Sequence, residues 1–182
     1  MRTVELRRHT ERDENEDLTP RGLEIAARAR ETLETPYDAH YVSPQRRARL
    51  TMEAFGVHDA LVERRFDARP RPPFAPFEPR WRAIRATGLD AVTAWFAVSE
   101  AASVLRDLGR RVREAVIDVA AGLPEEGRAL VVSHGGTIEP FAVVALHRPY
   151  PTIFGSRELG YCEGVRANLE GGRVVRVDVV RL

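Results

Sequence analysis

One stretch near the start of the sequence decides the fold: Val4-Glu5-Leu6-Arg7-Arg8-His9-Thr10. Its short apolar run, with β-branched residues at Thr3 and Val4, predicts a strand over residues 3–8. The run ends abruptly in two arginines and a histidine. Similar polar breaks follow two later predicted strands, at Ser43-Pro44 and at His134-Gly135-Gly136. These three strand ends are candidates for one shared site.

The composition is that of a soluble globular domain. The chain has 182 residues, of which 43% are apolar and 30% are charged, which suffices for one buried core. We expect residues 1–182 to form a single domain. No window is apolar for long enough to cross a bilayer, and acidic residues near the N-terminus argue against a signal peptide. The expected location is cytoplasmic, with no membrane partner.

The charge and the cysteine content exclude several kinds of chemistry. A net charge of +1 argues against nucleic acid as a partner. All 28 basic residues are arginine, and the absence of lysine excludes Schiff-base catalysis and the lysine of a nucleotide-binding P-loop. Cys162 is the only cysteine, so an internal disulfide is impossible and a cysteine-based zinc site lacks ligands. We expect no cofactor and no metal site.

Strand and helix signals alternate along the chain. Thr19-Pro20 is a helix cap followed by proline, and Ser43-Pro44 repeats that signal for a helix over 44–55 that Gly56 stops. Residues 39–43 and 128–133 are predicted strands, and the second has the strongest buried-strand pattern. Gly171-Gly172, between residues 161–169 and 173–181, predicts a hairpin. The alternation predicts an α/β domain with a mostly parallel sheet.

The middle of the chain is predicted to be mostly helical. Five prolines make residues 67–79 a stiff surface loop, after a short extended piece over 61–66. From Arg80 to Gly122 the pattern is helical, with breaks expected near Gly88 and Gly109. One apolar stripe is predicted to be core rather than a ligand groove, namely Trp95, Val98, Ala102 and Leu105. A further helix is predicted over roughly 138–147.

The strand ends bring polar side chains to one edge of the sheet. Ligands of open parallel sheets bind beyond the carboxyl ends of the strands. If the three strands are neighbours, Arg8, His9, Arg47 and His134 converge although the sequence separates them. Arg47 would then project one turn inside a helix N-terminus, the end of a helix that favours anions.

Two arginines and two histidines without metal-ligand spacing suit phosphoryl transfer. Arginine offers fixed charge and forked donors to phosphoryl oxygens. A neutral imidazole is a competent nucleophile toward phosphorus, and a second histidine, if protonated, stabilises charge on the transferring group. A carboxylic acid must still protonate the leaving oxygen and then activate water.

Four motifs resemble those of the histidine phosphatase superfamily, which has the phosphoglycerate-mutase-like fold. The signature Leu-x-Arg-His-Gly is matched by residues 6–10 except at the last position. The helix start Leu-Thr-x-x-Gly is matched by residues 18–22. Residues 43–51 match Ser-Pro-x-x-Arg-Ala-x-x-Thr, with Met52 departing from the alanine that follows, and residues 131–136 match a late strand-His-Gly-Gly turn.

The resemblance implies both a fold and a set of roles. The fold is a three-layer sandwich, in which helices flank a mostly parallel sheet that ends in a C-terminal antiparallel hairpin. His9 becomes the phosphorylated nucleophile, and Arg8, Arg47 and His134 become the phosphate pocket. The family often carries its general acid in a Leu-x-Glu segment, and Leu61-Val62-Glu63 fits that place. Glu63 is therefore the expected acid, with Glu11 and Glu139 as alternatives.

Thr10 departs from the family pattern, which has glycine directly after the nucleophile. Threonine is stiff and β-branched, so it is expected either to narrow the phosphate pocket or to donate its hydroxyl to phosphate. Glu11 and Gly135 complete the expected pocket. Residues 11–17 are rich in acidic side chains, and negative charge near the pocket should disfavour polyanionic substrates.

The resemblance implies a metal-independent phosphatase that hydrolyses phosphomonoesters or phosphoamides through a phosphohistidine on His9. In length the chain is similar to the smaller phosphatases, including phosphohistidine phosphatases, and it lacks the longer insertions of phosphoglycerate mutases. The expected partner is a phosphorylated small molecule or a phosphoprotein, and a homodimer is a possible assembly. Thr10 and the open assignment of the acid motivate an alternative, a pseudoenzyme that binds a phosphorylated ligand without turnover.

Overall fold

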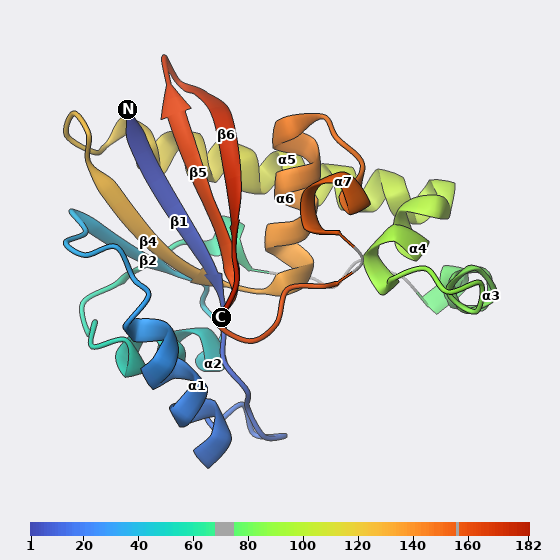
Figure 1. The fold of residues 1–182 in the computed structure, drawn as a ribbon, viewed down its shortest axis with the longest axis horizontal. Helices are drawn as coiled ribbons and strands as arrows, with labels where there is room; N and C mark the ends of the chain where they lie inside the picture. The colour runs from blue at the N-terminus through green and yellow to red at the C-terminus, as the bar shows by residue number, and fades with distance from the viewer. Residues whose placement is uncertain (68–74, 156) are drawn as a thin grey trace.

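The computed structural model describes residues 1–67, 75–155 and 157–182 (Figure 1). Its centre is a six-stranded sheet in the order β3-β2-β4-β1-β5-β6. The strands are β1 (Arg2–Arg8), β2 (Ala39–Val42), β3 (Leu61–Val62), β4 (Arg128–Ser133), β5 (Gly164–Glu170) and β6 (Arg173–Val180). The first four in this order run parallel, whereas β5 is antiparallel to β1 and β6 is antiparallel to β5. The predicted mostly parallel sheet with a C-terminal hairpin is confirmed.

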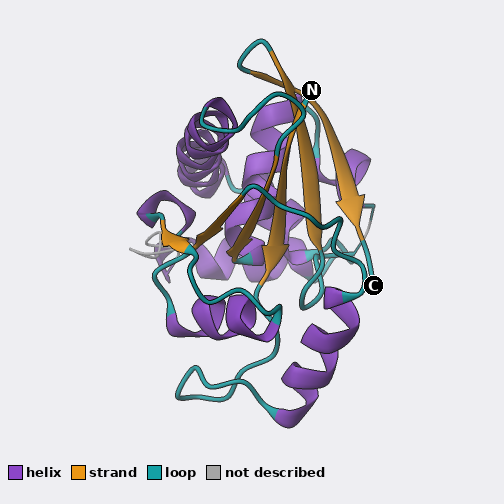
Figure 2. Ribbon diagram, turned by 90° about the vertical axis from the view of Figure 1, so that its left-hand side faces the viewer, coloured by secondary structure: helices purple, strands orange, loops and turns teal. Residues whose placement is uncertain are grey.

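Helices cover both faces of this sheet (Figure 2). Helices α1 (Pro20–Arg30) and α2 (Arg46–Ala54) contribute to a core on one face. Helices α5 (Ser99–Ala121), α6 (Gly135–Leu146) and α7 (Tyr150–Phe154) contribute to a larger core on the other. Helices α3 (Glu78–Arg85) and α4 (Ala91–Ala97) extend beyond the sheet (Figure 1). This arrangement confirms the expected three-layer sandwich.

Strand β1 sends its side chains alternately into the two cores. Val4 and Leu6 are fully buried in the larger core. Glu5 and Arg7 are 1% and 0% exposed, and the Arg7 guanidinium pairs with the Glu5 carboxylate at 2.5 Å. Arg166 pairs with the other Glu5 oxygen at 2.8 Å, and Arg7 also donates to the Cys162 carbonyl at 3.1 Å. Because each buried charge has a partner, none is left unpaired. The Arg7 side chain is therefore held inside the protein and does not point toward the strand end.

Helix α2 begins later than the sequence indicates. It starts at Arg46, with Gln45 as its N-cap, rather than at residue 44. The Ser43 hydroxyl lies 2.8 Å from Nε2 of His134, so it is engaged across the sheet and does not cap the helix. Arg47 is consequently the second residue of α2, in its first turn.

Gly109 lies inside the continuous helix α5, so the break expected there is wrong. It marks the place where α5 crosses α6. A Cβ atom on Gly109 would lie 2.5 Å from the Pro140 carbonyl oxygen and 2.7 Å from a methyl carbon of Val144. Gly88, by contrast, has a φ of 94° and does separate α3 from α4, as expected.

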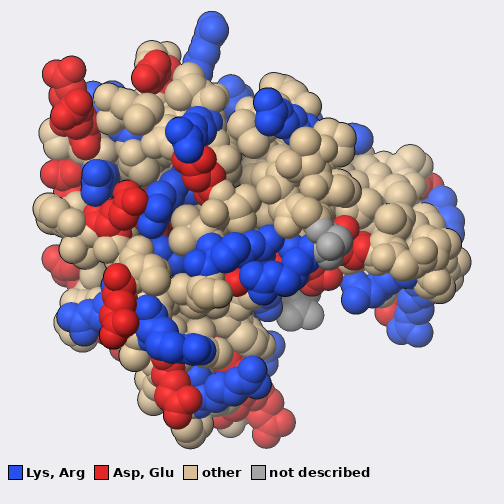
Figure 3. All heavy atoms as spheres, viewed as in Figure 1, with Lys and Arg blue, Asp and Glu red and all other residues tan. Residues whose placement is uncertain are grey.

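The segment between β3 and α3 is irregular. Strand β3 covers two residues, and the 3₁₀ helix η1 (Arg64–Phe66) follows it. Most of the predicted proline-rich loop, residues 68–74, lies outside the described residues. The described remainder forms the 3₁₀ helix η2 (Ala75–Phe77) and the start of α3. Within the described ranges, no helix combines the length and the apolar character needed to cross a membrane. Acidic and basic side chains interleave over much of the face in Figure 3.

Replacing Gly109 with alanine should destabilise the protein, because the new methyl group would push α6 away from α5. We expect a loss of about 1–3 kcal/mol in the free energy of unfolding, the usual range for overpacking, measured by urea denaturation. The control is Gly122→Ala at the C-cap of α5, where the nearest atom to a new Cβ is 3.6 Å away. That variant should stay within about 0.5 kcal/mol of wild type. Equal effects in the two variants would contradict close helix packing at Gly109.

Candidate active site

Three adjacent strands end together at one edge of the sheet. Arg8 of β1 is opposite Ser133 of β4, and Val132 of β4 is opposite Val42 of β2. The backbone N–H of His9 donates to the Ser133 carbonyl at 2.9 Å, and that of Ser43 donates to the Val132 carbonyl at 3.0 Å. The predicted strand ends are therefore neighbours, and the residues that follow them share one place.

The His9 ring is held in one orientation. Its Nδ1 atom lies 2.7 Å from the Thr10 carbonyl oxygen. A carbonyl can only accept a hydrogen bond, so Nδ1 carries the proton and Nε2 is the acceptor. Nε of Arg47 donates to this Nε2 atom at 3.0 Å. The ring thus presents the lone pair of Nε2 to the arginine beside it.

The surroundings of His9 keep its imidazole neutral. The pKa of His9 is lowered from 6.5 to about 4, chiefly by burial and also by the positive charges of Arg47 and Arg8, against the opposing hydrogen bond to the Thr10 carbonyl. At neutral pH the ring is therefore unprotonated in the ligand-free protein. A neutral imidazole with an accessible lone pair can act as a nucleophile.

His134 faces His9 across the strand ends, with 5.3 Å between the two ring centroids. Its Nδ1 atom lies 3.3 Å from a terminal nitrogen of Arg47. Arginine only donates, so Nδ1 is an acceptor in this arrangement, and Nε2–H donates to the Ser43 hydroxyl at 2.8 Å. The serine of the Ser43-Pro44 motif thus orients the second histidine.

These side chains line a cleft with a volume of about 320 Å³. Arg8, His9, Arg47 and His134 all contribute to its wall, as the strand-end argument expects. The Arg8 guanidinium donates to the Leu159 carbonyl, and it stacks 4.7 Å from the centroid of the Tyr161 ring. Two arginines and two imidazoles therefore surround one cavity of the size of a small phosphorylated group.

Gly135 lines the cleft, but the Thr10 side chain does not face it. A Cβ atom on Gly135 would lie 3.3 Å from Cδ of Arg8, so glycine leaves room for that arginine. The Thr10 side chain is fully buried, and its hydroxyl donates to the Gly22 carbonyl at 2.7 Å. Neither expectation for Thr10 holds, because this hydroxyl ties the strand end to helix α1.

The three candidate carboxyl groups have different surroundings. Glu139 lines the cleft and is 3% exposed. Its carboxylate accepts from the Tyr150 hydroxyl at 3.0 Å and from the Leu159 backbone N–H at 2.8 Å. Burial nevertheless raises the pKa of the Glu139 carboxyl. Burial therefore shifts the Glu139 carboxyl toward its protonated form, whereas the nearby charge of Arg8 acts in the opposite direction.

Glu63 and Glu11 lie outside the described lining of the cleft. Glu63 pairs with Arg65 at 2.9 Å and caps η1, and the hydrogen bond from Arg65 lowers the pKa of the Glu63 carboxyl. Glu11 accepts a hydrogen bond from the Thr19 hydroxyl at 2.9 Å. Both carboxyl groups are occupied by local contacts.

The sequence pattern did not predict several residues that line the cleft. Trp95 and Leu105, expected in the core, form part of the cleft wall, together with Val92 and Glu158. Apolar spacing on a helix does not distinguish a core face from a cleft face. Among the described residues, no cluster of three or more His, Cys, Asp or Glu side chains is arranged to hold a metal ion.

An acidic side chain already contacts the arginine at the centre of the cleft. The Glu16 carboxylate forms an ion pair with Arg47. Glu16 belongs to the acidic segment 11–17 and has a φ of 65°, in the left-handed region. The segment that was expected near the pocket therefore delivers one carboxylate directly to Arg47.

The fold and the paired arginines and histidines define a phosphate-handling α/β domain. The model of the histidine phosphatase superfamily (branch 1) matches residues 3–179. The chain belongs to this superfamily. No curated protein sequence matches the chain as a relative.

Solved structures share the fold along the whole chain. A phosphoserine phosphatase from Entamoeba histolytica, solved with 3-phosphoglyceric acid, is 17% identical with a TM-score of 0.70, and the match covers 100% of this chain and 98% of that one. A mycobacterial glucosyl-3-phosphoglycerate phosphatase, solved with VO₃, is 19% identical with a TM-score of 0.67 and coverage of 99% and 98%. A phosphoglycerate mutase from Bacillus anthracis is 14% identical with a TM-score of 0.61 and coverage of 99% and 92%.

Replacing Glu16 with glutamine should strengthen the binding of inorganic phosphate. The carboxylate competes with phosphate for Arg47 and repels it, so its removal should lower the dissociation constant about tenfold, equivalent to about 1.4 kcal/mol, by isothermal titration calorimetry. Asp17→Asn is the matched control, because Asp17 lies in the same segment but pairs with the exposed Arg46. If both variants tighten phosphate equally, the effect is one of general charge and the specific competition is disproved.

Proposed function

We propose that the chain is a phosphatase that hydrolyses phosphomonoesters or phosphoamides through a phosphohistidine on Nε2 of His9. One observation carries this proposal. The His9 ring has a lowered pKa, is oriented by the Thr10 carbonyl, and directs the lone pair of Nε2 toward Arg47 in a cleft that two arginines line. Such a nucleophile beside fixed cations matches what transfer of a phosphoryl group requires.

The first half of the reaction forms the phosphoenzyme. Arg8 and Arg47 hold the phosphoryl oxygens, with Arg47 leaving its contacts to His9 and Glu16. Nε2 of His9 then attacks phosphorus, an N–P bond forms, and the bond to the leaving oxygen breaks. Nδ1 of His134 points toward the same cavity, where a proton on it would stabilise the transferring group.

Glu139 is the residue that we propose as the general acid, in preference to Glu63. Burial raises its pKa, which favours the protonated form that a general acid needs, and it lines the cleft beside the place of the leaving oxygen. In the second half of the reaction, the Glu139 carboxylate takes a proton from water as the water attacks phosphorus. The N–P bond then breaks, and inorganic phosphate and neutral His9 are regenerated.

The substrate that we propose is a phosphorylated small molecule. The cleft is small, and the similar structures include proteins described as phosphatases of phosphoserine and of glucosyl-3-phosphoglycerate. The Glu16 carboxylate at Arg47 adds negative charge beside the cleft, which favours a substrate with one phosphate over a polyanion. A phosphoprotein is the alternative substrate that we propose from the sequence. On the same basis we propose a cytoplasmic location and a homodimer.

Incubation with a ³²P-labelled aryl phosphate, with a chelator present, should label the wild-type protein. The label should survive alkali and be lost in acid, as expected of a phosphoamide. His9→Ala should abolish labelling and lower turnover by at least about 10³-fold, whereas His58→Ala, at an exposed histidine, should behave like wild type.

Two results would contradict the phosphohistidine mechanism. One is turnover that survives in His9→Ala. The other is an inactive wild-type protein that still binds phosphate or vanadate, which would favour the binding protein without turnover.

The general acid can be identified by leaving-group dependence. Glu139→Gln should slow an alkyl phosphate by about 10²–10³-fold but slow p-nitrophenyl phosphate much less, because the aryl leaving group needs little protonation. Glu63→Gln is the matched control and should change neither rate by more than about threefold. The glutamine side chain keeps an acceptor for Tyr150 and Leu159, and circular dichroism checks folding. The reverse pattern, with Glu63→Gln selective for the alkyl ester, would restore Glu63 as the acid.

A further inference from the structure

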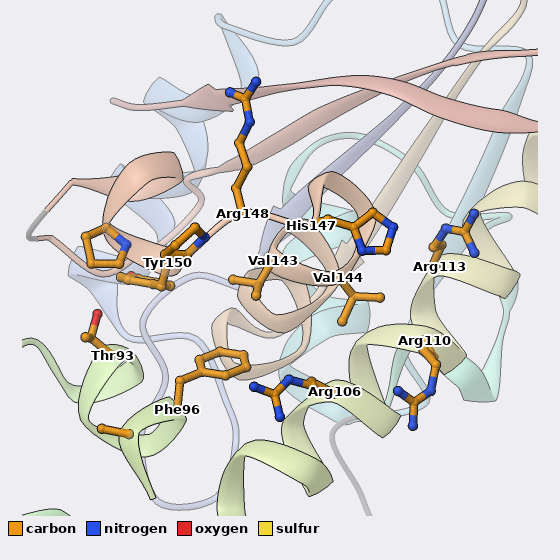
Figure 4. Close-up of a pocket in the computed structure, with 13 residues that line it drawn as sticks. Thr93, Phe96, Arg106, Arg110, Arg113, Val143, Val144, His147, Arg148 and Tyr150 are labelled. Atoms are coloured by element: carbon orange, nitrogen blue, oxygen red, sulfur yellow. The ribbon is translucent and has the colours of Figure 1, made fainter. Parts of the chain in front are cut away.

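A second and larger cleft lies between helices α4, α5 and α6, apart from the candidate active site (Figure 4). Its volume is about 710 Å³, against about 320 Å³ for the catalytic cleft. Pockets that hold small organic ligands occupy roughly 300–1,000 Å³. The second cleft is therefore large enough for a molecule with a substantial organic body.

The same helices serve the two clefts with different side chains. On α4, Val92 and Trp95 line the catalytic cleft, whereas Thr93 and Phe96 line the second. On α5, Leu105 lines the first and Arg106 lines the second. None of the described lining residues belongs to both clefts, so the second cleft is a separate binding volume.

The floor of the second cleft is apolar. Figure 4 shows Val143 and Val144 of α6 across from Phe96 of α4, with Arg106 of α5 beside the Phe96 ring. All three apolar side chains are partly exposed, so their surfaces are available to a ligand. Removal of such surface from water is favourable, so the cleft suits an occupant with an aromatic or branched apolar group.

One wall of the cleft is positively charged. Arg106, Arg110 and Arg113 stand at spacings of four and three residues on α5, so they share one face of that helix. His147, at the end of α6, lies beside them (Figure 4). Arg148 also lines the cleft, but its guanidinium extends away from Phe96 and Val143.

No acidic side chain neutralises this wall among the described lining residues. Arg110 forms an ion pair with Asp107, which is 63% exposed. Neither Arg106 nor Arg113 has a carboxylate partner within 4.0 Å in the described part of the chain. Many other arginines of the chain do have such partners, including Arg65, Arg166 and Arg181. Unpaired guanidinium groups beside apolar surface provide donors for a carboxylate, sulfonate or phosphate.

We propose that this second cleft binds a small organic anion, whose apolar body packs on Phe96 and Val143 and whose acidic group pairs with Arg106 and Arg113. If the arginines of α5 were only solvated surface charges, their presence would need no ligand. That explanation does not cover the concave apolar surface that lies beside them in the same cleft. The inference concerns binding and does not rest on the phosphatase mechanism.

The test uses 1-anilinonaphthalene-8-sulfonate, an aromatic anion whose fluorescence rises on binding, with the 182-residue chain. The wild type should bind this probe at one site. Arg106→Gln/Arg113→Gln should raise the dissociation constant at least about tenfold, which corresponds to about 1.4 kcal/mol of binding free energy. The matched control Arg173→Gln/Arg176→Gln removes the same charge from β6 and should bind like wild type. N-phenyl-1-naphthylamine, which lacks the sulfonate, should bind about tenfold more weakly than the anion.

A competition arm distinguishes the two clefts. Saturating vanadate should leave the probe bound, because vanadate should occupy the cleft of His9 and Arg47. Val143→Glu, which places a carboxylate on the apolar floor, should also abolish probe binding while circular dichroism and the rate with p-nitrophenyl phosphate stay at wild-type values.

Four results would overturn the proposal. They are unchanged affinity in the double-arginine variant, displacement of the probe by vanadate, equal binding of the neutral analogue, and self-association of the wild type that the double-arginine variant loses. The last result, seen by analytical ultracentrifugation, would assign the face to a second copy of the chain instead.

Discussion

The candidate active site depends on the alignment of three parallel strand ends. Arg8 opposite Ser133, and Val132 opposite Val42, bring β1, β4 and β2 to the same edge. The backbone hydrogen bonds from His9 and Ser43 to β4 fix where each chain leaves the sheet. Side chains alternate along a strand, so a slip of one residue would turn Arg7 toward the cleft and Arg8 away from it. The buried pair of Arg7 with Glu5 opposes such a slip, since both charged groups would move together into the larger apolar core and lose their contacts to Arg166 and to the Cys162 carbonyl.

Arg47 is at the centre of the electrostatics of this cleft. It donates to Nε2 of His9, lies beside Nδ1 of His134 and pairs with the Glu16 carboxylate. Burial and the charges of Arg47 and Arg8 hold the pKa of His9 down, so the cations that suit a phosphate also keep the imidazole neutral. Glu139 experiences the opposite effect of burial, because removal from water favours the neutral form of a carboxyl group. Burial in one cleft thus favours the neutral form of both the imidazole and the carboxyl group.

Helix packing separates the catalytic cleft from the second cleft, which lies between α4, α5 and α6. The close crossing at Gly109 brings α5 against α6, and α4 packs against α5 and α7. Tyr150 connects the two volumes, because its ring lines the second cleft while its hydroxyl donates to Glu139. Nothing in the pattern of apolar residues along α4 and α5 distinguishes Trp95, which faces the catalytic cleft, from Phe96, which faces the other. A difference of one position on a helix rotates a side chain by about 100°, so the assignment depends on how the helices pack.

The sequence by itself determined the strand ends and the residue types at them. Arg8, His9 and His134 follow local strand signals, and the hairpin at Gly171-Gly172 follows local turn chemistry, since both glycines have a positive φ. Only the tertiary structure decided which carboxyl group lines the cleft and which of the expected pocket side chains point elsewhere. Glu139 lines the cleft near Arg8, and Glu16 forms an ion pair with Arg47. Glu63 instead pairs with Arg65, and the Thr10 hydroxyl donates to the Gly22 carbonyl. The reason is physical: strand and turn propensities act over a few residues, whereas burial, ion pairing and pKa depend on groups that are distant in sequence and meet only after folding.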